Sequence, residues 1–201
     1  KQAAGELVPD VSALEILHCE EHDRWAKECA DEGVTLVKDT QHLLPIDPKK
    51  HKRVLLELMG DFPSNKRVCG SFVQKLEARG FEVTVYEPEG FEVMEDSVES
   101  FKNRYDLVFY VGNIETASNK TVSRLNWHTM FGLGNNMPWM VYEVPALFVS
   151  VGNPYHLLDA PMVKTYVNGY CNSEYVIDAV IEKLCGDSEF KGKSPVDPFC
   201  G

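Results

Sequence analysis

The stretch FVSVGNPYHLLDAP, Phe148–Pro161, decides the fold that the sequence predicts. An apolar run over residues 146–149 leads into it, and the turn Gly152-Asn153-Pro154 ends it. A short apolar run bounded by turn residues is typical of a buried central strand. In an open α/β sheet, ligands bind at the loops that follow the carboxyl ends of the strands. We therefore expect the turn at Asn153 to lie at a functional surface.

Strands and helices alternate outward from this stretch. Apolar runs or alternating patterns predict strands at residues 54–59 (VLLELM), 81–86 (FEVTVY), 107–111 and 162–167. Helical spacing predicts helices over residues 67–79, 93–105 and 173–184, and an earlier one over 12–37 that Gly33 ends or loosens near its carboxyl end. The order predicts a three-layer α/β/α sandwich, flavodoxin-like, with a mostly parallel sheet of five to six strands and helices on both faces.

Composition narrows the classes of partner. The chain has 201 residues and a formal net charge of −11, which argues against nucleic acid and anionic membrane surfaces because both attract Lys and Arg patches. No apolar run reaches the roughly 18 residues of a membrane span. The chain opens on a polar stretch without Met, so we expect a piece of a longer protein in which residues 1–11 are a linker and residues 12–201 one domain.

The cysteines and histidines indicate neither a disulfide framework nor a metal site. The six cysteines form no CxxC pair, and scattered cysteines of this kind are usually free thiols. Free thiols favour a reducing compartment, so we expect a cytoplasmic protein. His18 and His22 are four residues apart on a predicted helix, but no third ligand lies nearby. We expect no metal and no cofactor.

Motifs for self-contained catalysis are missing. The sequence has no GxSxG elbow around Ser150, no GxGxxG fingerprint and no P-loop. Its carboxylates do not stand out as an acid/base pair. The residues alone predict an acidic α/β domain without an active site of its own.

The long connection over residues 114–144 breaks the alternation of strands and helices. Connections of this length in a compact domain are usually functional or face a partner. Two interpretations of its Arg and Trp cluster stay open: the cluster lines a sugar or an interface, or the Trp packs the loop onto the core while the Arg pairs with a surface acid. The candidate substrate-binding or partner-facing residues, here and in the turn after residue 151, are Arg124, Trp127, His128, Asn153, Tyr155 and His156.

Four segments, in order along the chain, resemble the C-terminal domain of glycoside hydrolase family 3. They are EEHDRWAKECADEGVTLVKDTQHLLPI (20–46), VSVGNPY (149–155), YVNGY (166–170) with the helix after it, and LCGDSEFKGKSPV (184–196). Within the family, NPYHLLD (153–159) and SPVDPFCG (194–201) are most similar to the two-domain β-N-acetylhexosaminidases of Gram-positive bacteria. The resemblance covers nearly the whole chain.

The resemblance implies an N-terminal (β/α)₈ barrel that binds the sugar and carries the catalytic groups, an Asp nucleophile and an Asp-His acid/base pair. A barrel needs roughly 250 residues, so this chain does not hold it. The chain would then be an auxiliary domain, inactive alone, of an enzyme that removes N-acetylglucosamine from cell-wall or chitin-type saccharides. We expect no catalytic residue in it.

Two alternatives remain. In the family's β-glucosidases an acid/base Glu comes from the loop after the strand that matches residues 107–111, and Glu115 is the only acid in that loop here. The surrounding pattern departs from theirs, so we expect Glu115 to be structural. The other alternative is a binding module without catalysis, for carbohydrate or protein, which exposed stacking aromatics such as Trp127 and Trp139 would support.

Overall fold

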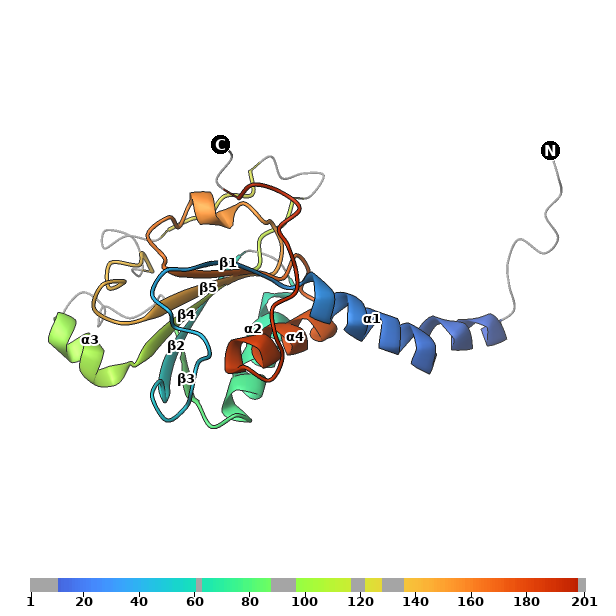
Figure 1. Cartoon of the computed structure of the whole chain (residues 1–201), viewed down its shortest axis with the longest axis horizontal. Helices are drawn as coiled ribbons and strands as arrows, with labels where there is room; N and C mark the ends of the chain where they lie inside the picture. The colour runs from blue at the N-terminus through green and yellow to red at the C-terminus, as the bar shows by residue number, and fades with distance from the viewer. Residues whose placement is uncertain (1–10, 61–62, 88–96, 117–121, 128–135, 199–201) are drawn as a thin grey trace.

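The computed structural model describes residues 11–60, 63–87, 97–116, 122–127 and 136–198. In this part a six-stranded sheet has the order β1-β6-β5-β4-β2-β3, and its strands run parallel except β1, which is antiparallel to β6 (Figure 1). The strands are β1 (Thr35–Asp39), β2 (Arg53–Met59), β3 (Glu82–Val85), β4 (Leu107–Gly112), β5 (Ala146–Ser150) and β6 (Thr165–Asn168). The expected α/β/α sandwich is confirmed.

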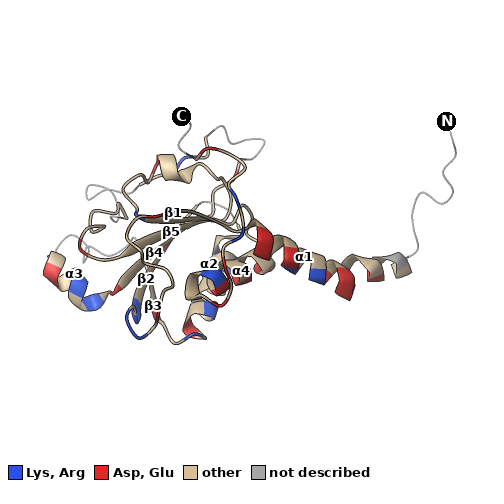
Figure 2. Cartoon of the chain, in the orientation of Figure 1, with Lys and Arg blue, Asp and Glu red and all other residues tan. Residues whose placement is uncertain are grey.

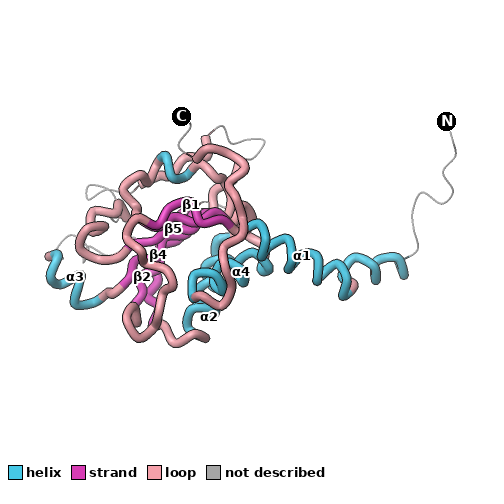
Figure 3. Tube along the Cα trace, in the orientation of Figure 1, coloured by secondary structure: helices cyan, strands magenta, loops and turns pink. Residues whose placement is uncertain are grey.

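The two faces of the sheet are covered differently (Figure 3). One face packs against three regular helices: α1 (Glu20–Gly33), α2 (Asn65–Glu77) and α4 (Glu174–Cys185). The other packs against the short helix α3 (Val98–Arg104), the 3₁₀ helix η3 (His156–Leu158) and irregular segments around Trp127 and Trp139–Val144. The apolar side chains of β2, β4 and β5 alternate between the two faces, as the pleat of a strand requires.

The helix predicted over residues 12–37 was wrong at its carboxyl end, where the first strand lies. The chain forms a 3₁₀ helix, η1 (Val11–His18), then α1, and leaves the helix after Gly33. Residues 35–39 pair with β6 instead, with Thr35 opposite Asn168 and Asp39 opposite Thr165. The helical spacing of apolar residues continues into residues 35–37, so the sequence favours helix there. The strand forms because of its pairing with β6, which lies far along the chain. The helix predicted over 93–105 begins at Val98 in the described residues, since 88–96 lie outside them.

Local signals in the sequence set several of the helix ends. Ser97 and Ser173 each accept a hydrogen bond from the backbone three residues on, which caps the N-termini of α3 and α4. Gly186 ends α4 with a φ of 84°, a left-handed conformation that glycine adopts without strain. The bounds of α4 agree with the helix predicted over 173–184 to within one residue.

A buried lysine joins α1 to α4. The side chain of Lys183 is fully buried, and its Nζ donates to Asp31 Oδ1 at 2.7 Å, to the Glu189 carbonyl at 2.6 Å and to Ser188 Oγ at 3.2 Å. Lys191 Nζ lies 2.6 Å from the other oxygen of Asp31. These two lysines lower the pKa of Asp31 to about 2. The ammonium of Lys183 is thus fully hydrogen-bonded, as a buried charge must be.

Candidate functional site

The carboxyl ends of the parallel strands form one edge of the sheet, where the turns after β4 and β5 meet. Val151 N donates to the Gly112 carbonyl at 2.9 Å, and Asn153 N donates to the Ile114 carbonyl at 3.3 Å. A Cβ on Gly152 would lie 2.7 Å from the Ile114 carbonyl oxygen and 3.1 Å from Cγ of Glu115. Only glycine therefore fits at 152, and the two turns are held in direct contact.

Asn113, which is fully buried, is the centre of a partly buried amide network at this edge. Its Nδ2 donates to Asn65 Oδ1 at 2.6 Å and to Ser64 Oγ at 3.1 Å, and its Oδ1 accepts from Asn172 Nδ2 at 2.9 Å. The network joins the end of β4 to the start of α2 and to the loop before α4. Because both ends of the Asn113 amide have partners inside the protein, this residue stabilises the edge.

Ser150 and His156 form a buried pair in the turn after β5. Ser150 Oγ donates to the Asn153 carbonyl at 2.7 Å and lies 2.9 Å from His156 Nδ1. The hydroxyl has one proton, so the imidazole is the donor in the second contact. Burial lowers the pKa of His156 to about 4, against smaller opposing effects of the Ser123 backbone and Asp159, so the ring is neutral at pH 7. His156 is 1% exposed and Ser150 is fully buried, which makes the pair part of the core and keeps it from contact with a saccharide.

Asp159, at the end of η3, holds the middle of the long connection. Its carboxylate pairs with the Arg124 guanidinium and accepts from Leu125 N at 3.0 Å, and its backbone carbonyl accepts from Trp127 Nε1 at 3.0 Å. Asn153 Nδ2 adds a hydrogen bond to Ser123 Oγ at 2.9 Å. We call these contacts between residues 123–127 and the turn 153–159 the Asp159 clamp. It fixes a segment that has no helix or strand of its own.

The Asp159 clamp brings together most of the candidate residues from the sequence. Arg124, Trp127 and Asn153 all belong to it, and His156 lies beneath it. Tyr155 is 37% exposed at the tip of the turn, where its backbone N–H bonds to Asn153 Oδ1 at 2.9 Å. His128 lies outside the described residues. Of the two interpretations of the Arg and Trp cluster, these contacts match the one in which the Trp packs on the core and the Arg pairs with an acid.

Trp127 and Trp139, which could have formed an exposed stacking platform, are both partly buried. Trp127 is half-buried and packs edge-on against Tyr110, with ring centroids 5.9 Å apart. Trp139 is half-buried and packs edge-on against Phe101 at 5.4 Å. Both indoles are occupied by the core of this domain, which is evidence against the binding module that they would have supported.

Sequence reasoning missed two carboxylates. Asp159 lies within the quoted stretch, but a sequence does not say which acid Arg124 meets 35 residues away. Glu57 is 2% exposed on β2, opposite Tyr110 of β4, and its Oε2 has no hydrogen-bond partner among the described residues. Burial raises the pKa of Glu57 well above that of an ordinary glutamate. The signal for Glu57 was a lone acid inside the apolar run VLLELM.

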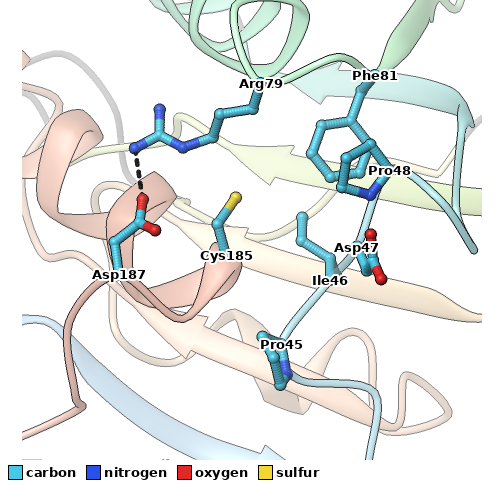
Figure 4. A pocket seen from close by; sticks show the side chains of 8 residues that line it. All are labelled: Pro45, Ile46, Asp47, Pro48, Arg79, Phe81, Cys185 and Asp187. Carbon is cyan, nitrogen blue, oxygen red and sulfur yellow. Dashed lines mark hydrogen bonds and ion pairs between the residues drawn. The ribbon is translucent and has the colours of Figure 1, made fainter.

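A crevice of about 380 Å³ lies at the opposite edge, at the amino ends of β2 and β3 (Figure 4). Arg79 and Asp187 form an ion pair of 3.0 Å at one side of it. Burial raises the pKa of the Cys185 thiol to about 11, so this cysteine is a poor nucleophile. The other residues that line it are Pro45, Ile46, Asp47, Pro48 and Phe81. Both carboxylates that line it have partners within the protein: Asp187 pairs with Arg79, and Asp47 Oδ1 accepts from Lys49 N at 2.8 Å.

In the described residues no three His, Cys, Asp or Glu side chains lie close enough together to hold a metal ion. No helix of the described chain is long and apolar enough to cross a membrane. The described residues thus provide a carboxyl edge on which the Asp159 clamp holds residues 123–127.

Comparison with known proteins gives the family. No protein-family model matches the chain. It is 38% identical over 204 residues to a β-N-acetylglucosaminidase/β-glucosidase of Cellulomonas fimi, a match covering 98% of this chain and 36% of that protein. The solved structure of β-glucoside phosphorylase BglX is 41% identical, with a TM-score of 0.88, over 98% of this chain and 35% of that one.

A further solved structure, a glycoside hydrolase family 3 β-N-acetylglucosaminidase from Paenibacillus sp. str. FPU-7, shares the fold at 16% identity, with a TM-score of 0.57 over 94% of this chain and 35% of that one. The chain spans about a third of the length of each of these proteins. The matches cover nearly all of the described sheet and helices, and they agree with the four sequence segments above. The chain belongs to glycoside hydrolase family 3 and is its C-terminal α/β domain.

Proposed function

We propose that the chain is the auxiliary domain of a β-N-acetylglucosaminidase whose catalytic groups lie on an N-terminal (β/α)₈ barrel. The observation that carries the proposal is the 38% identity, along 98% of this chain, to a protein named β-N-acetylglucosaminidase/β-glucosidase. Retaining hydrolysis needs two carboxyl-type groups about 5 Å apart across the scissile bond. The described residues offer no such pair open to solvent at the carboxyl edge.

The role that fits the geometry is to hold a loop against the barrel. The Asp159 clamp fixes residues 123–127 on the carboxyl edge, while Tyr155 stays partly exposed beside it. A loop fixed in this way shapes the rim of a neighbouring site with little loss of conformational entropy on binding. In this proposal the barrel faces residues 122–127 and the turn at Asn153–His156.

The test is hydrolysis of a chromogenic N-acetyl-β-glucosaminide by this chain and by the full-length protein, at equal concentrations. We expect turnover in the full-length protein and none in the chain alone. Turnover by the chain alone would refute the auxiliary role, because the chemistry would then lie among its own carboxylates. No turnover by either protein, on this substrate or on the matching β-glucoside, would refute the glycosidase.

A second candidate reaction is phosphorolysis, which one observation favours: the solved structure at 41% identity is titled a β-glucoside phosphorylase. Hydrolysis and phosphorolysis differ in the acceptor, water or inorganic phosphate, and hence in the product, a free sugar or a sugar 1-phosphate. Product analysis of the full-length reaction with and without phosphate separates them. Sugar 1-phosphate that forms only with phosphate present would establish the phosphorylase.

Glu115 tests the third possibility, an acid/base supplied by this domain. Its side chain is half-buried and its Cγ lies against Gly152, which suits a packing role. We expect Glu115→Gln in the full-length protein to lower kcat/KM by less than about tenfold, whereas loss of an acid/base typically costs roughly 100- to 10,000-fold. A loss in that larger range, restored with an activated leaving group, would make Glu115 catalytic.

A further inference from the structure

The N-terminal 3₁₀ helix carries an apolar surface that this domain does not use. In a 3₁₀ helix, residues three apart lie on one side, so Val11, Leu14 and Leu17 of η1 form a continuous stripe. Their side chains are 76%, 58% and 60% exposed, and that of Ile16 is 61% exposed. Glu15 is the only Asp, Glu, Lys or Arg in η1. In Figure 2 the outer end of this helical segment is mainly tan, whereas α1 carries several charged residues. We call these four apolar side chains the η1 stripe.

The η1 stripe projects away from the core. In Figure 1, η1 and the start of α1 extend from the body as a rod, and the only substantial contacts of η1 with another described element are with α1. Trp25, in the second turn of α1, is 47% exposed and lies beside His22, with ring centroids 5.4 Å apart. A contiguous exposed apolar surface of this kind marks an interaction site.

An isolated helix of this length is also unstable in water. A 3₁₀ run of eight residues is longer than most, and short helices gain their stability from packing of an apolar face. The η1 stripe is the face available for such packing. Helix formation over residues 11–18 and burial of the stripe are therefore expected to be one event.

We infer that the η1 stripe docks against the N-terminal domain of the same polypeptide; this rests on the two-domain protein of the proposed function. The matched relatives continue for about two-thirds of their length beyond this domain, so a large covalently linked partner exists in them. An η1 helix of eight residues is only about 16 Å long. A stable dimer buries about 800 Å² on each partner, which the stripe cannot supply.

Covalent linkage removes that requirement. When two surfaces belong to one chain, a small patch is enough, because the effective concentration of one domain near the other is in the millimolar range. The N-terminal domain is therefore the occupant that fits the size of the η1 stripe. A second copy of this chain is the alternative outcome.

The experiment uses the full-length protein with the double substitution Leu14→Glu/Leu17→Glu. The readout is the rate at which a broad-specificity protease separates this domain from the rest. We expect separation to be at least about tenfold faster, because the undocked segment is open to cleavage. The matched control is Val98→Glu, another exposed aliphatic position (41%) at the start of α3, where separation should be unchanged.

Hydrogen exchange of the β4 and β5 amides in the same samples checks that the fold is intact. If exchange of these amides increases, Leu14→Ala/Leu17→Ala is used instead, and we expect a smaller increase in the rate of cleavage. Equal cleavage rates for wild type and variant would overturn the inference. So would conversion of a dimer to a monomer, measured by light scattering, without a change in cleavage. Absence of glycosidase activity in the wild-type protein would defeat the proposed function but leave a positive cleavage result standing.

Discussion

The two faces of the sheet use polar groups differently. On the helix-covered face, the helices bond to one another through buried polar side chains: Lys183 of α4 with Asp31 of α1, and Ser71 of α2 with Glu174 of α4 at 2.6 Å. On the loop-covered face, polar side chains come from the strands themselves, as Glu57 and Ser150 do. The helix-covered face therefore stabilises the fold, and the loop-covered face combines packing with the positioning of the carboxyl-edge turns.

Aromatic stacking holds the loop-covered face together. Phe148 is fully buried between Tyr110 and Tyr166, with ring centroids 6.2 and 5.3 Å away and near-parallel planes. His156 contacts the edge of the same ring at 6.2 Å. On the helix-covered face the equivalent large ring is Phe72, which packs on Phe109 at 5.6 Å.

The largest expected effect on stability comes from removing the buried rings of Phe148 and Phe72. Phe148→Ala and Phe72→Ala should each lower the free energy of unfolding by about 3–5 kcal/mol, since each removes a buried aromatic ring. Urea unfolding of this domain would measure both. In the full-length protein at a temperature where both variants stay folded, we expect only Phe148→Ala to reduce kcat/KM. Equal losses of kcat/KM in Phe148→Ala and Phe72→Ala would contradict the different roles of the two faces.

Asp31→Ala tests the helix-covered face at its charged contact. It leaves the Lys183 ammonium buried without its carboxylate, and we expect a loss of about 2–3 kcal/mol at pH 7. The two lysines lower the pKa of Asp31 from 3.8 to about 2, so its stabilisation is full above about pH 4 and declines as the pH falls toward 2. Unfolding curves at pH 7 and pH 2.5 should show a smaller gap between wild type and variant at the lower pH. Lys183→Met in the Asp31→Ala background should restore part of the lost stability.

Glu57 gives the loop-covered face a different pH dependence. Burial raises its pKa in the folded protein, so the folded state holds a proton that the unfolded chain releases above its own pKa. Stability is therefore greatest below the unfolded pKa and decreases as the pH rises toward the folded one. Glu57→Gln, which cannot ionise, should lose this dependence and become relatively more stable as the pH rises. A parallel stability profile for wild type and variant between pH 5 and 8 would contradict the burial of a neutral carboxyl.

The smallest effect on stability is expected at Arg124. Its side chain is 64% exposed, so Arg124→Ala should cost about 1 kcal/mol or less, although it breaks the ion pair with Asp159. In the full-length protein the same change loosens the Asp159 clamp, and we expect kcat/KM to decrease by about tenfold because a rim loop is misplaced. Arg104→Ala, on α3, is the matched control, for which activity should be unchanged. If Arg124→Ala had the kcat/KM of wild type, the Asp159 clamp would have no role in catalysis.

The sequence predicted most of the fold because its signals are local. The apolar runs at 54–59 and 107–111 and the helical spacing over 173–184 each act within a few residues, and the corresponding elements β2, β4 and α4 are confirmed. The helix predicted as far as residue 37 was wrong at its end, because residues 35–39 become strand β1 by pairing with β6. Propensity and periodicity cannot report a partner at that distance.

The candidate site was predictable as a region but not as a set of contacts. Gly152-Asn153-Pro154 correctly indicated a turn at the carboxyl end of a central strand. The partners inside that region, Asp159 for Arg124 and Ser150 for His156, follow from the three-dimensional path of the chain. The burial of His156 likewise depends on how η3 folds back over Phe148.

The antiparallel pairing of β1 with β6 has a consequence for biosynthesis. Among the strands of this sheet, β1 leaves the ribosome before its partner β6, and Asp39 meets Thr165 only after 126 more residues have been made. Until then β1 is an unpaired edge with no neighbour on either side, which is a site for wrong association between nascent chains. Contacts at such long sequence separation also slow folding. Strand β1 therefore joins the sheet only after β6 has been made. Chains that stop before Thr165 should leave β1 unpaired and should be prone to aggregate.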